Sequence, residues 1–236
     1  MTVKVLLVPI GYCHSELKQR YETPRQGVLA GDNMSVIKLE PGQNFEQAAK
    51  DLEGFDRIWV IYNFHLNKNW KPQVTPPRYT RKKIGVFATR APYRPNHIGL
   101  SCVKLVKVDG LNVYIAGADI LNGTPILDIK PYLPYSDSFP DSATGWVKSG
   151  FDNRYEVIFE EEAEKQAGII KSETKTNLIN YTRLQLEFCP GDITRKRITL
   201  LNEDTFNYTL AYRQYRIYYS VAENEKKVII KRIGKI

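Results

Sequence analysis

The side chains best suited to chemistry lie in two stretches that combine charged groups with stiff or extended backbone. The first runs from Gly85 to Ser101 and carries Arg90, Arg94 and Asn96 in a turn held by prolines, which fix φ. Guanidinium groups pair with carboxylates and phosphates through two parallel hydrogen bonds. We therefore expect this turn to bind an anion or the anionic part of a cofactor, although a stiff surface loop with incidental arginines fits the pattern equally well.

The second stretch, Gly117 to Tyr135, contains a carboxylate two residues away from a cation. In an extended segment Asp128 and Lys130 lie on one side, and Ile126 joins them if the alternation holds. Such a pair is either a simple ion pair or a carboxylate poised to orient a substrate. Both interpretations remain open on the residues alone.

Several other chemistries find no support in the sequence. There is no P-loop, no GxGxxG and no HExxH pattern. The three histidines are scattered, and Cys13, Cys102 and Cys189 suggest neither a disulfide framework nor a zinc site, so we expect no metal. Free thiols fit a reducing compartment, and no apolar run is long enough to cross a membrane. We expect a cytoplasmic protein without a signal peptide.

The charge is unevenly distributed along the chain. The net charge is +8, yet the segment from Arg57 to Val108 contains eleven basic residues and no acid. A long acid-free segment of this kind attracts phosphate, although a solvated basic face without a partner has the same composition. The proline-rich loop within it offers the most obvious contacts for phosphate groups, namely Arg78, Arg81, Lys82 and Lys83.

Short strands separated by turns dominate the first part of the chain and favour an antiparallel barrel or sandwich. The clearest signal is Asp109-Gly110, which predicts a hairpin between Cys102–Val108 and Leu111–Ala116. We also expect strands at 3–8, 35–39, 57–64 and 84–89, and a helix at 45–52.

A composition shift between Pro140 and Gly150 predicts a boundary between a domain of residues 1–150 and a smaller one of residues 151–236. The second domain reads as two helices, at 160–175 and 176–188, followed by strands within 208–236. Its tyrosines alternate with lysines and arginines, as suits RNA binding, although an ordinary half-buried sheet would have the same pattern.

The two chemical stretches resemble the signature motifs of the TrmO (TsaA-like) family of S-adenosylmethionine-dependent tRNA methyltransferases. Further matches are Pro24-Arg25-Gln26, Phe64-His65 and Pro76-Pro77-Arg78, so the resemblance covers roughly residues 3 to 146. It implies a mainly β protein, with a small antiparallel β-barrel instead of a Rossmann fold, a C-terminal α+β domain, and a homodimer. The chain departs from the usual family residues at Ala91 (Ser or Thr), His97 (Pro) and Asn122 (often Asp).

The resemblance also implies a reaction and its cofactor. The family transfers a methyl group from S-adenosylmethionine to the exocyclic nitrogen of a threonylcarbamoyl-modified adenosine at tRNA position 37, 3′ to the anticodon. Carried over to this sequence, the cofactor contacts fall on Pro24, Arg25, Gln26, His65, Leu66, Arg90, Leu100, Gly123, Thr124, Pro125 and Ile126.

For this reaction the acceptor nitrogen must lose a proton, and we expect Asp128 or His65 to take it. Arg90 and Arg94 suit a carboxylate of the cofactor or of the threonyl group. Further substrate contacts are expected at Asn96, Lys130 and Tyr132, beside the four basic residues of the proline-rich loop. The alternatives are a non-enzymatic RNA-binding barrel and a methyltransferase of the same family with another acceptor.

Overall fold

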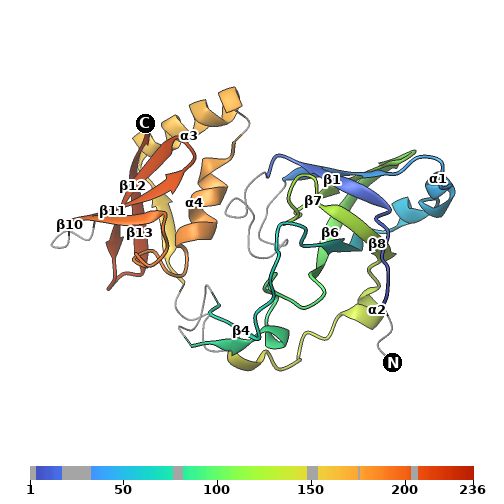
Figure 1. The fold of residues 1–236 in the computed structure, drawn as a ribbon. Coiled ribbons are helices and arrows are strands. Elements are labelled where there is room, and N and C mark those ends of the chain that lie inside the picture. Colours follow the sequence, from blue (N-terminus) through green and yellow to red (C-terminus); the bar gives the residue numbers. More distant parts are fainter. Residues whose placement is uncertain (1–3, 18–32, 77–81, 148–153, 175, 203–206) are drawn as a thin grey trace. The chain divides into compact units, whose positions relative to one another are not determined.

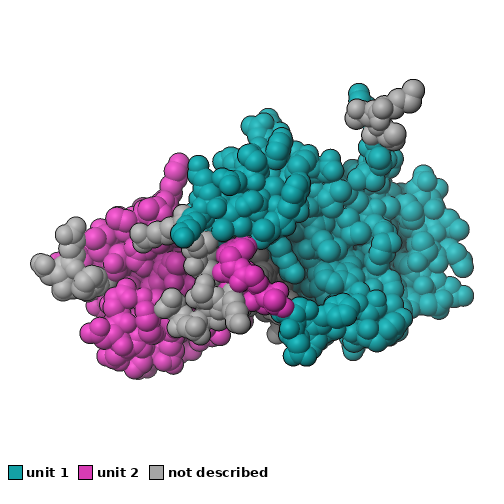
Figure 2. Space-filling view, turned by 90° about the horizontal axis from the view of Figure 1, so that it is seen from below, with its two compact units in different colours: residues 1–76, 82–142 teal, residues 77–81, 143–236 magenta. Residues whose placement is uncertain are grey.

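The computed structural model of the 236-residue chain describes residues 4–17, 33–76, 82–147, 154–174, 176–202 and 207–236. The chain divides into two compact units, one made of 1–76 and 82–142 and the other containing 143–236 (Figure 2). Each unit has its own sheet and its own buried residues. No helix in the described part of the chain has the length and apolar character that a membrane span requires.

The first unit is built on a closed antiparallel barrel with the strand order β1-β2-β7-β6-β3-β8 (Figure 1). These strands are β1 (Gly11–Ser15), β2 (Met34–Leu39), β3 (Arg57–Asn63), β6 (Ile98–Asp109), β7 (Asn112–Ala116) and β8 (Pro125–Pro131). The unit also contains the strand pair β4 (Gln73–Val74) and β5 (Ile84–Gly85), the short helices α1 (Phe45–Ala48) and α2 (Pro134–Asp137), and the 3-10 turns η2 (Leu52–Gly54) and η3 (Val86–Ala88). The mainly β prediction is confirmed.

Alternating side chains form the barrel core. In β3, Ile58, Val60 and Tyr62 are buried, whereas Trp59 and Ile61 between them face outward and are partly exposed. Burial of each such aliphatic side chain stabilises the fold by roughly 1.5–3 kcal/mol. The other strands contribute further residues to the same cluster, including Cys13, Ile37, Val103, Val113, Ile115 and Ile126.

The predicted hairpin is confirmed, since β6 and β7 pair from Lys104–Ala116 to Asp109–Asn112. Asp109 is itself a paired residue, so the loop consists of Gly110 and Leu111, and Gly110 has the positive φ of 55° that glycine tolerates.

Two predicted strands are wrong. The first strand begins at Gly11, opposite Leu39 at the end of β2, whereas residues 4–8 of the expected strand are exposed and form no strand, and Val3 lies outside the described residues. Residues 84–89 are strand only over Ile84–Gly85. The chain then turns through η3, where the Thr89 backbone N–H and hydroxyl both donate to the Val86 carbonyl.

The second unit contains a five-stranded sheet with the order β10-β11-β12-β13-β9. Its elements are η4 (Gly145–Val147), β9 (Glu156–Phe159), α3 (Glu161–Thr174), α4 (Leu178–Leu186), β10 (Ile198–Asn202), β11 (Asn207–Tyr212), β12 (Tyr215–Ala222) and β13 (Lys227–Lys235). The two helices and the last three strands lie close to their predicted positions, whereas β9 and β10 were not expected. β9 joins the edge of the sheet parallel to β13, which the long connection through two helices and three strands allows.

Candidate functional site

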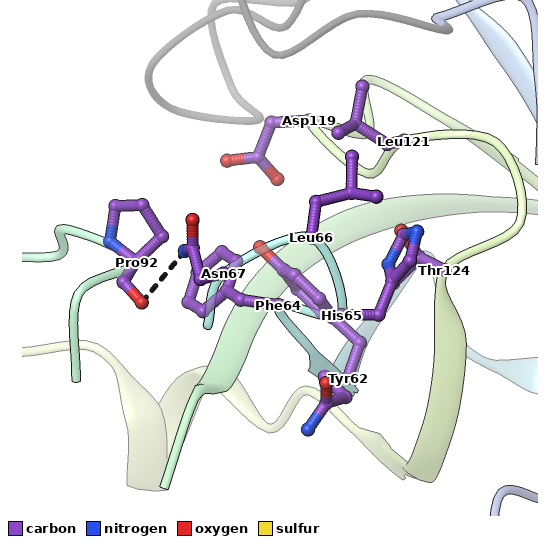
Figure 3. A pocket seen from close by; sticks show the side chains of 10 residues that line it. Tyr62, Phe64, His65, Leu66, Asn67, Pro92, Asp119, Leu121 and Thr124 are labelled. Carbon is purple, nitrogen blue, oxygen red and sulfur yellow. Dashed lines mark hydrogen bonds between the residues drawn. The ribbon is translucent and has the colours of Figure 1, made fainter. Parts of the chain in front are cut away.

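A pocket lies at the end of the barrel where β3 and β7 finish and β6 and β8 begin (Figure 3). Because neighbouring strands are antiparallel, the chain leaves and re-enters the barrel at this end and brings distant segments together. The residues that line it are Tyr62, Asn63, Phe64, His65, Leu66, Asn67, Pro92, Asp119, Leu121 and Thr124.

One wall of the pocket is the turn that follows β3. The Phe64 N–H donates to the His97 carbonyl at 2.7 Å, and the Asn67 N–H donates back to the Phe64 carbonyl at 2.8 Å. The Asn67 side chain also donates to the Pro92 carbonyl at 3.0 Å, as the dashed line in Figure 3 marks. This turn leaves the side chains of His65 and Leu66 exposed at the pocket.

A second wall comes from the tight connection between β7 and β8. Gly123 has a φ of 75°, and its N–H donates to the Cys13 carbonyl at 2.8 Å, while the Cys13 N–H donates to the Thr124 carbonyl at 2.9 Å. Asn122 accepts from the Ser15 N–H through its side-chain oxygen at 3.1 Å. β1 therefore fixes the connection, and Thr124 is buried beside the pocket.

The proline-rich turn before β6 is held by its own arginine. Arg94 donates from Nη1 to the carbonyls of Val86 at 3.1 Å and Thr89 at 2.8 Å, and its guanidinium lies 5.7 Å from the centre of the Phe87 ring. These contacts shape the loop itself. Arg90, in the same turn, is exposed, and its positive charge acts on Asp119.

Asp119 is the acidic residue of the pocket lining, and it is half-buried. The Ser101 hydroxyl donates to Asp119 Oδ1 at 2.5 Å, and the Tyr62 hydroxyl lies 3.2 Å from the same Ser101 oxygen. Burial raises the pKa of the Asp119 carboxyl above its ordinary value, while the Ser101 hydrogen bond and the positive charge of Arg90 act in the opposite direction. The pocket thus contains a carboxylate held in a fixed orientation.

A glycine makes room for this arrangement. Gly99 lies opposite Tyr62 in the β3–β6 ladder, and a Cβ atom built on it would come within 2.4 Å of the Tyr62 ring. A larger residue at position 99 would push the ring away from Ser101, so the glycine is part of the support for Asp119.

Comparison with known proteins agrees with this geometry. A family model described as the tRNA-methyltransferase O N-terminal domain matches residues 12–138, which is just over half of the chain and includes every residue of the pocket lining. The chain belongs to the TrmO family.

Relatives and solved structures extend the comparison. The chain is 43% identical over 141 residues to a rat protein named tRNA (adenine(37)-N6)-methyltransferase, matching 58% of this chain but only 33% of the rat protein, so it spans about a third of that relative. It is 40% identical over 162 residues, 67% of each chain, to a Pseudomonas aeruginosa protein named putative S-adenosylmethionine-dependent methyltransferase RcsF. A crystal structure of TrmO from Pseudomonas aeruginosa superposes with a TM-score of 0.68 at 26% identity, covering 98% of this chain and 100% of that one.

The structure brings together only some of the residues expected from the TrmO motifs. His65, Leu66 and Thr124 line the pocket, and Gly123 and Pro125 flank Thr124. Pro24, Arg25, Gln26, Arg78 and Arg81 lie outside the described residues. Four other residues were expected to contact the substrate from the two proline-containing loops. They are partly or fully exposed, namely Lys82, Lys83, Arg94 and Asn96.

Two expected contacts lie elsewhere on the barrel. Leu100 is 54% exposed on the outer face of β6, opposite Ile61. Ile126 is fully buried in the barrel core and does not share a side with Asp128, because the β3–β8 register shifts between Ile61 and Tyr62 and leaves Leu127 as an extra residue. The expected alternation of Ile126 with Asp128 and Lys130 is therefore wrong.

Asp128 and Lys130 lie on the outer face of β8, where their side chains form an ion pair of 2.9 Å. Asp128 also accepts from the Ile129 N–H at 2.9 Å, and its side chain is 45% exposed. Tyr132 packs at the same face against Trp59, with ring centres 5.8 Å apart. None of these residues belongs to the described lining of the pocket.

At each of the three departures from the usual TrmO residues, the residue present makes a local hydrogen bond. His97 has a φ of 52° and donates its N–H to the Arg94 carbonyl, and a proline could provide neither feature. At Asn122 an aspartate would accept the same hydrogen bond from Ser15. The Ala91 N–H is satisfied by the Thr89 hydroxyl at 3.2 Å. Among the described residues no cluster of His, Cys, Asp and Glu side chains is arranged to hold a metal ion.

Proposed function

We propose that the chain is an S-adenosylmethionine-dependent tRNA methyltransferase that methylates the exocyclic nitrogen of adenosine 37, with the pocket at the barrel end as its active site. The observation that carries the proposal is that the family match spans every residue lining a pocket that holds an oriented carboxylate. The names of the rat and Pseudomonas relatives supply the acceptor base and the methyl donor. Such an enzyme acts in the cytoplasm, where tRNA is modified.

The residues of the pocket fit S-adenosylmethionine chemically. The molecule carries an ammonium group, a carboxylate, a sulfonium and an aromatic base, and the pocket offers apolar contacts from Phe64, Leu66 and Leu121. The guanidinium of Arg90, whose positive charge acts on Asp119 of the pocket, suits the cofactor carboxylate. When bound, S-adenosylmethionine supplies an activated methyl group, so the protein needs chiefly to position the reactants.

The chain's own residues divide into two roles. His65, Leu66, Arg90 and the Gly123–Pro125 turn bind the cofactor, together with Pro24, Arg25 and Gln26. Leu100 and Ile126, which the resemblance also implies, lie outside the pocket lining. The basic residues of the proline-rich loop, with Asn96, bind the tRNA backbone. Residues 1–150 form the methyltransferase domain, and residues 151–236 form a separate basic domain.

The finer specificity rests on the family resemblance alone. We propose that the acceptor is adenosine 37 that already carries a threonylcarbamoyl group. We also propose a homodimer, supported by the exposed apolar side chains of Ile98, Leu100 and Val106 along β6. Light scattering of the purified chain tests the dimer, and a monomer at all concentrations would contradict it.

The experiment that tests the function is methyl transfer to tRNA followed by nucleoside mass spectrometry. The full chain is incubated with S-adenosylmethionine and either of two tRNA pools, one with and one without the threonylcarbamoyl group at adenosine 37. We expect one added methyl group on the modified nucleoside only. Transfer to the unmodified pool would identify a different acceptor, and tRNA binding without transfer to either pool would support a non-enzymatic RNA-binding barrel.

A further inference from the structure

The proposed reaction requires a proton acceptor beside the nitrogen that is methylated. The lone pair of an exocyclic adenine nitrogen is delocalised into the ring, and the nitrogen must lose its proton as the new bond to carbon forms. A side chain that takes this proton must lie within hydrogen-bond reach, roughly 2.6–3.2 Å, of the nitrogen. The structure offers two aspartates in the motif after β7, Asp119 and Asp128, and they differ in their place in the fold and in their hydrogen-bond and ion-pair partners.

Asp119 faces the pocket. Figure 3 shows its carboxylate turned toward Leu66 and Asn67 and into the space that the lining residues enclose. Asp128 lies on the outer face of β8, half exposed, with its oxygens engaged by Lys130 and by the Ile129 N–H. Of the two aspartates, Asp119 is therefore the one placed to contact a nucleobase that enters the pocket.

Two hydroxyl groups, linked by hydrogen bonds, fix the orientation of Asp119. An ionised carboxylate only accepts hydrogen bonds, so the single proton of the Ser101 hydroxyl points to Asp119 Oδ1, and the Tyr62 hydroxyl donates to Ser101. Tyr62 and Ser101 are both buried, at 5% exposure each, and Tyr62 is itself located by Gly99. Ser101 thus engages Oδ1, and we assign the incoming proton to the other oxygen, Oδ2.

The electrostatic surroundings suit a base. Burial raises the pKa of Asp119, which makes its carboxylate a stronger proton acceptor than an exposed aspartate. The positive charge of Arg90 lowers the same pKa and so favours the ionised form that a base requires. Burial is the larger influence, so the pKa remains raised and the carboxylate is more basic than an exposed aspartate, while Arg90 offsets part of the cost of its charge.

We propose that Asp119 is the catalytic proton acceptor for methyl transfer, and that Ser101 and Tyr62 are its positioning residues. In the step, the bond between the acceptor nitrogen and the methyl carbon forms while the carbon–sulfur bond of S-adenosylmethionine breaks. The electron pair of that bond stays on sulfur, and the N–H proton passes to Asp119 Oδ2. This inference rests on the proposed function, because it needs the methyl acceptor to lie in the pocket.

The test compares Asp119→Asn with the matched variant Asp128→Asn in the full chain. Single-turnover methyl transfer to threonylcarbamoyl-modified tRNA is measured across pH, and S-adenosylmethionine binding is measured by calorimetry. We expect Asp119→Asn to slow transfer by about 10²–10⁴-fold while the Kd for S-adenosylmethionine changes little, as for loss of a general base. Asp128→Asn should transfer at nearly the wild-type rate.

A second variant provides a readout apart from activity. Ser101→Ala keeps the carboxylate but removes a hydrogen bond that lowers its pKa. The Asp119 carboxyl carbon, followed by NMR in the unliganded protein, should therefore titrate at higher pH than in wild type. The acid limb of the transfer rate should move in the same direction. This variant also serves if Asp119→Asn fails to fold.

Three outcomes would overturn the inference. A rate for Asp119→Asn close to wild type would exclude Asp119 as the proton acceptor, and unshifted titration of Asp119 in Ser101→Ala would exclude Ser101 as its positioning residue. Loss of S-adenosylmethionine binding in Asp119→Asn, in proportion to the lost rate, would make Asp119 a cofactor ligand. If the wild-type protein neither binds S-adenosylmethionine nor transfers methyl, the proposed function itself fails and the assignment of Asp119 falls with it.

Discussion

The pocket end of the barrel and the outer face of β8 each contain an aspartate from the same motif, but the two aspartates contact different partners. Asp119 is half-buried, accepts a hydrogen bond from the buried Ser101 and is influenced by the positive charge of Arg90. Asp128 is half exposed and paired with the lysine two residues along the strand. Asp128, which has a lysine two residues away in the sequence, is engaged in an ion pair with that lysine. Asp119, which has no such neighbour in the sequence, is instead oriented toward the pocket.

The largest expected effect comes from disturbing the support of Asp119. Gly99→Ala places a Cβ within 2.4 Å of the Tyr62 ring, and overpacking of this kind costs about 1–3 kcal/mol. We expect a lower free energy of unfolding in urea and a large loss of methyl transfer, because the displaced ring no longer positions Ser101.

The matched control is Gly85→Ala. Gly85 has a φ of −54°, and nothing lies within 4 Å of its added Cβ. If both alanine variants lost stability and activity equally, the close approach of Gly99 to Tyr62 would have no special role.

A smaller effect, with a defined sign, is expected from Asp119→Asn on stability. Burial raises the pKa of Asp119 in the folded state above its value in the unfolded chain. Between these two pKa values the folded protein binds more protons than the unfolded chain, so stability falls as pH rises through this range. Ionised Asp119 therefore destabilises the fold at neutral pH. Asp119→Asn should raise the Tm at neutral pH, and the gain should vanish in acid below the ordinary pKa of aspartate. A loss of Tm that is the same at both pH values would contradict this reasoning.

For Asp137→Asn, outside the pocket, we expect the opposite change in stability at neutral pH. Asp137 Oδ2 accepts from the Leu133 N–H at 2.9 Å and from Trp59 Nε1 at 3.0 Å, and these hydrogen bonds lower its pKa in the folded state. The stability they contribute is present above the ordinary pKa and is lost as pH falls through the lowered value. Asp137→Asn should lower the Tm slightly at neutral pH, and thermal melts in acid should converge with wild type.

Much of the barrel could be predicted from sequence. The alternation of Ile58, Val60 and Tyr62 and the Asp-Gly hairpin both depend on local patterns, and both are present in the structure. The strand expected over residues 84–89 failed because the hydrogen bonds of Thr89 to Val86 favour a turn, which hydrophobic pattern alone does not reveal.

The site was harder to predict because its geometry is non-local. His65 and Thr124 were expected from the family motifs, but Asp119 was not singled out, although it lies in the same motif as Asp128. Its partners Tyr62 and Ser101 are on other strands, and the shift in the β3–β8 register that moves Ile126 into the core cannot be read from alternation. The sequence feature that could have pointed to Asp119 is that its carboxylate interrupts an otherwise apolar run, Ala118 to Leu121.

The measurement that tests the central claim most directly is calorimetric titration of the chain with S-adenosylmethionine, using Arg90→Ala as the pocket variant and Lys130→Ala as the control on the outer face. The account predicts micromolar binding, about −8 kcal/mol, by wild type and Lys130→Ala. Arg90→Ala should bind about tenfold or more weakly, since a hydrogen bond to a charged group contributes about 1.5–3 kcal/mol. Absence of binding by folded wild-type protein, or equal weakening by both substitutions, would contradict the placement of the cofactor in this pocket.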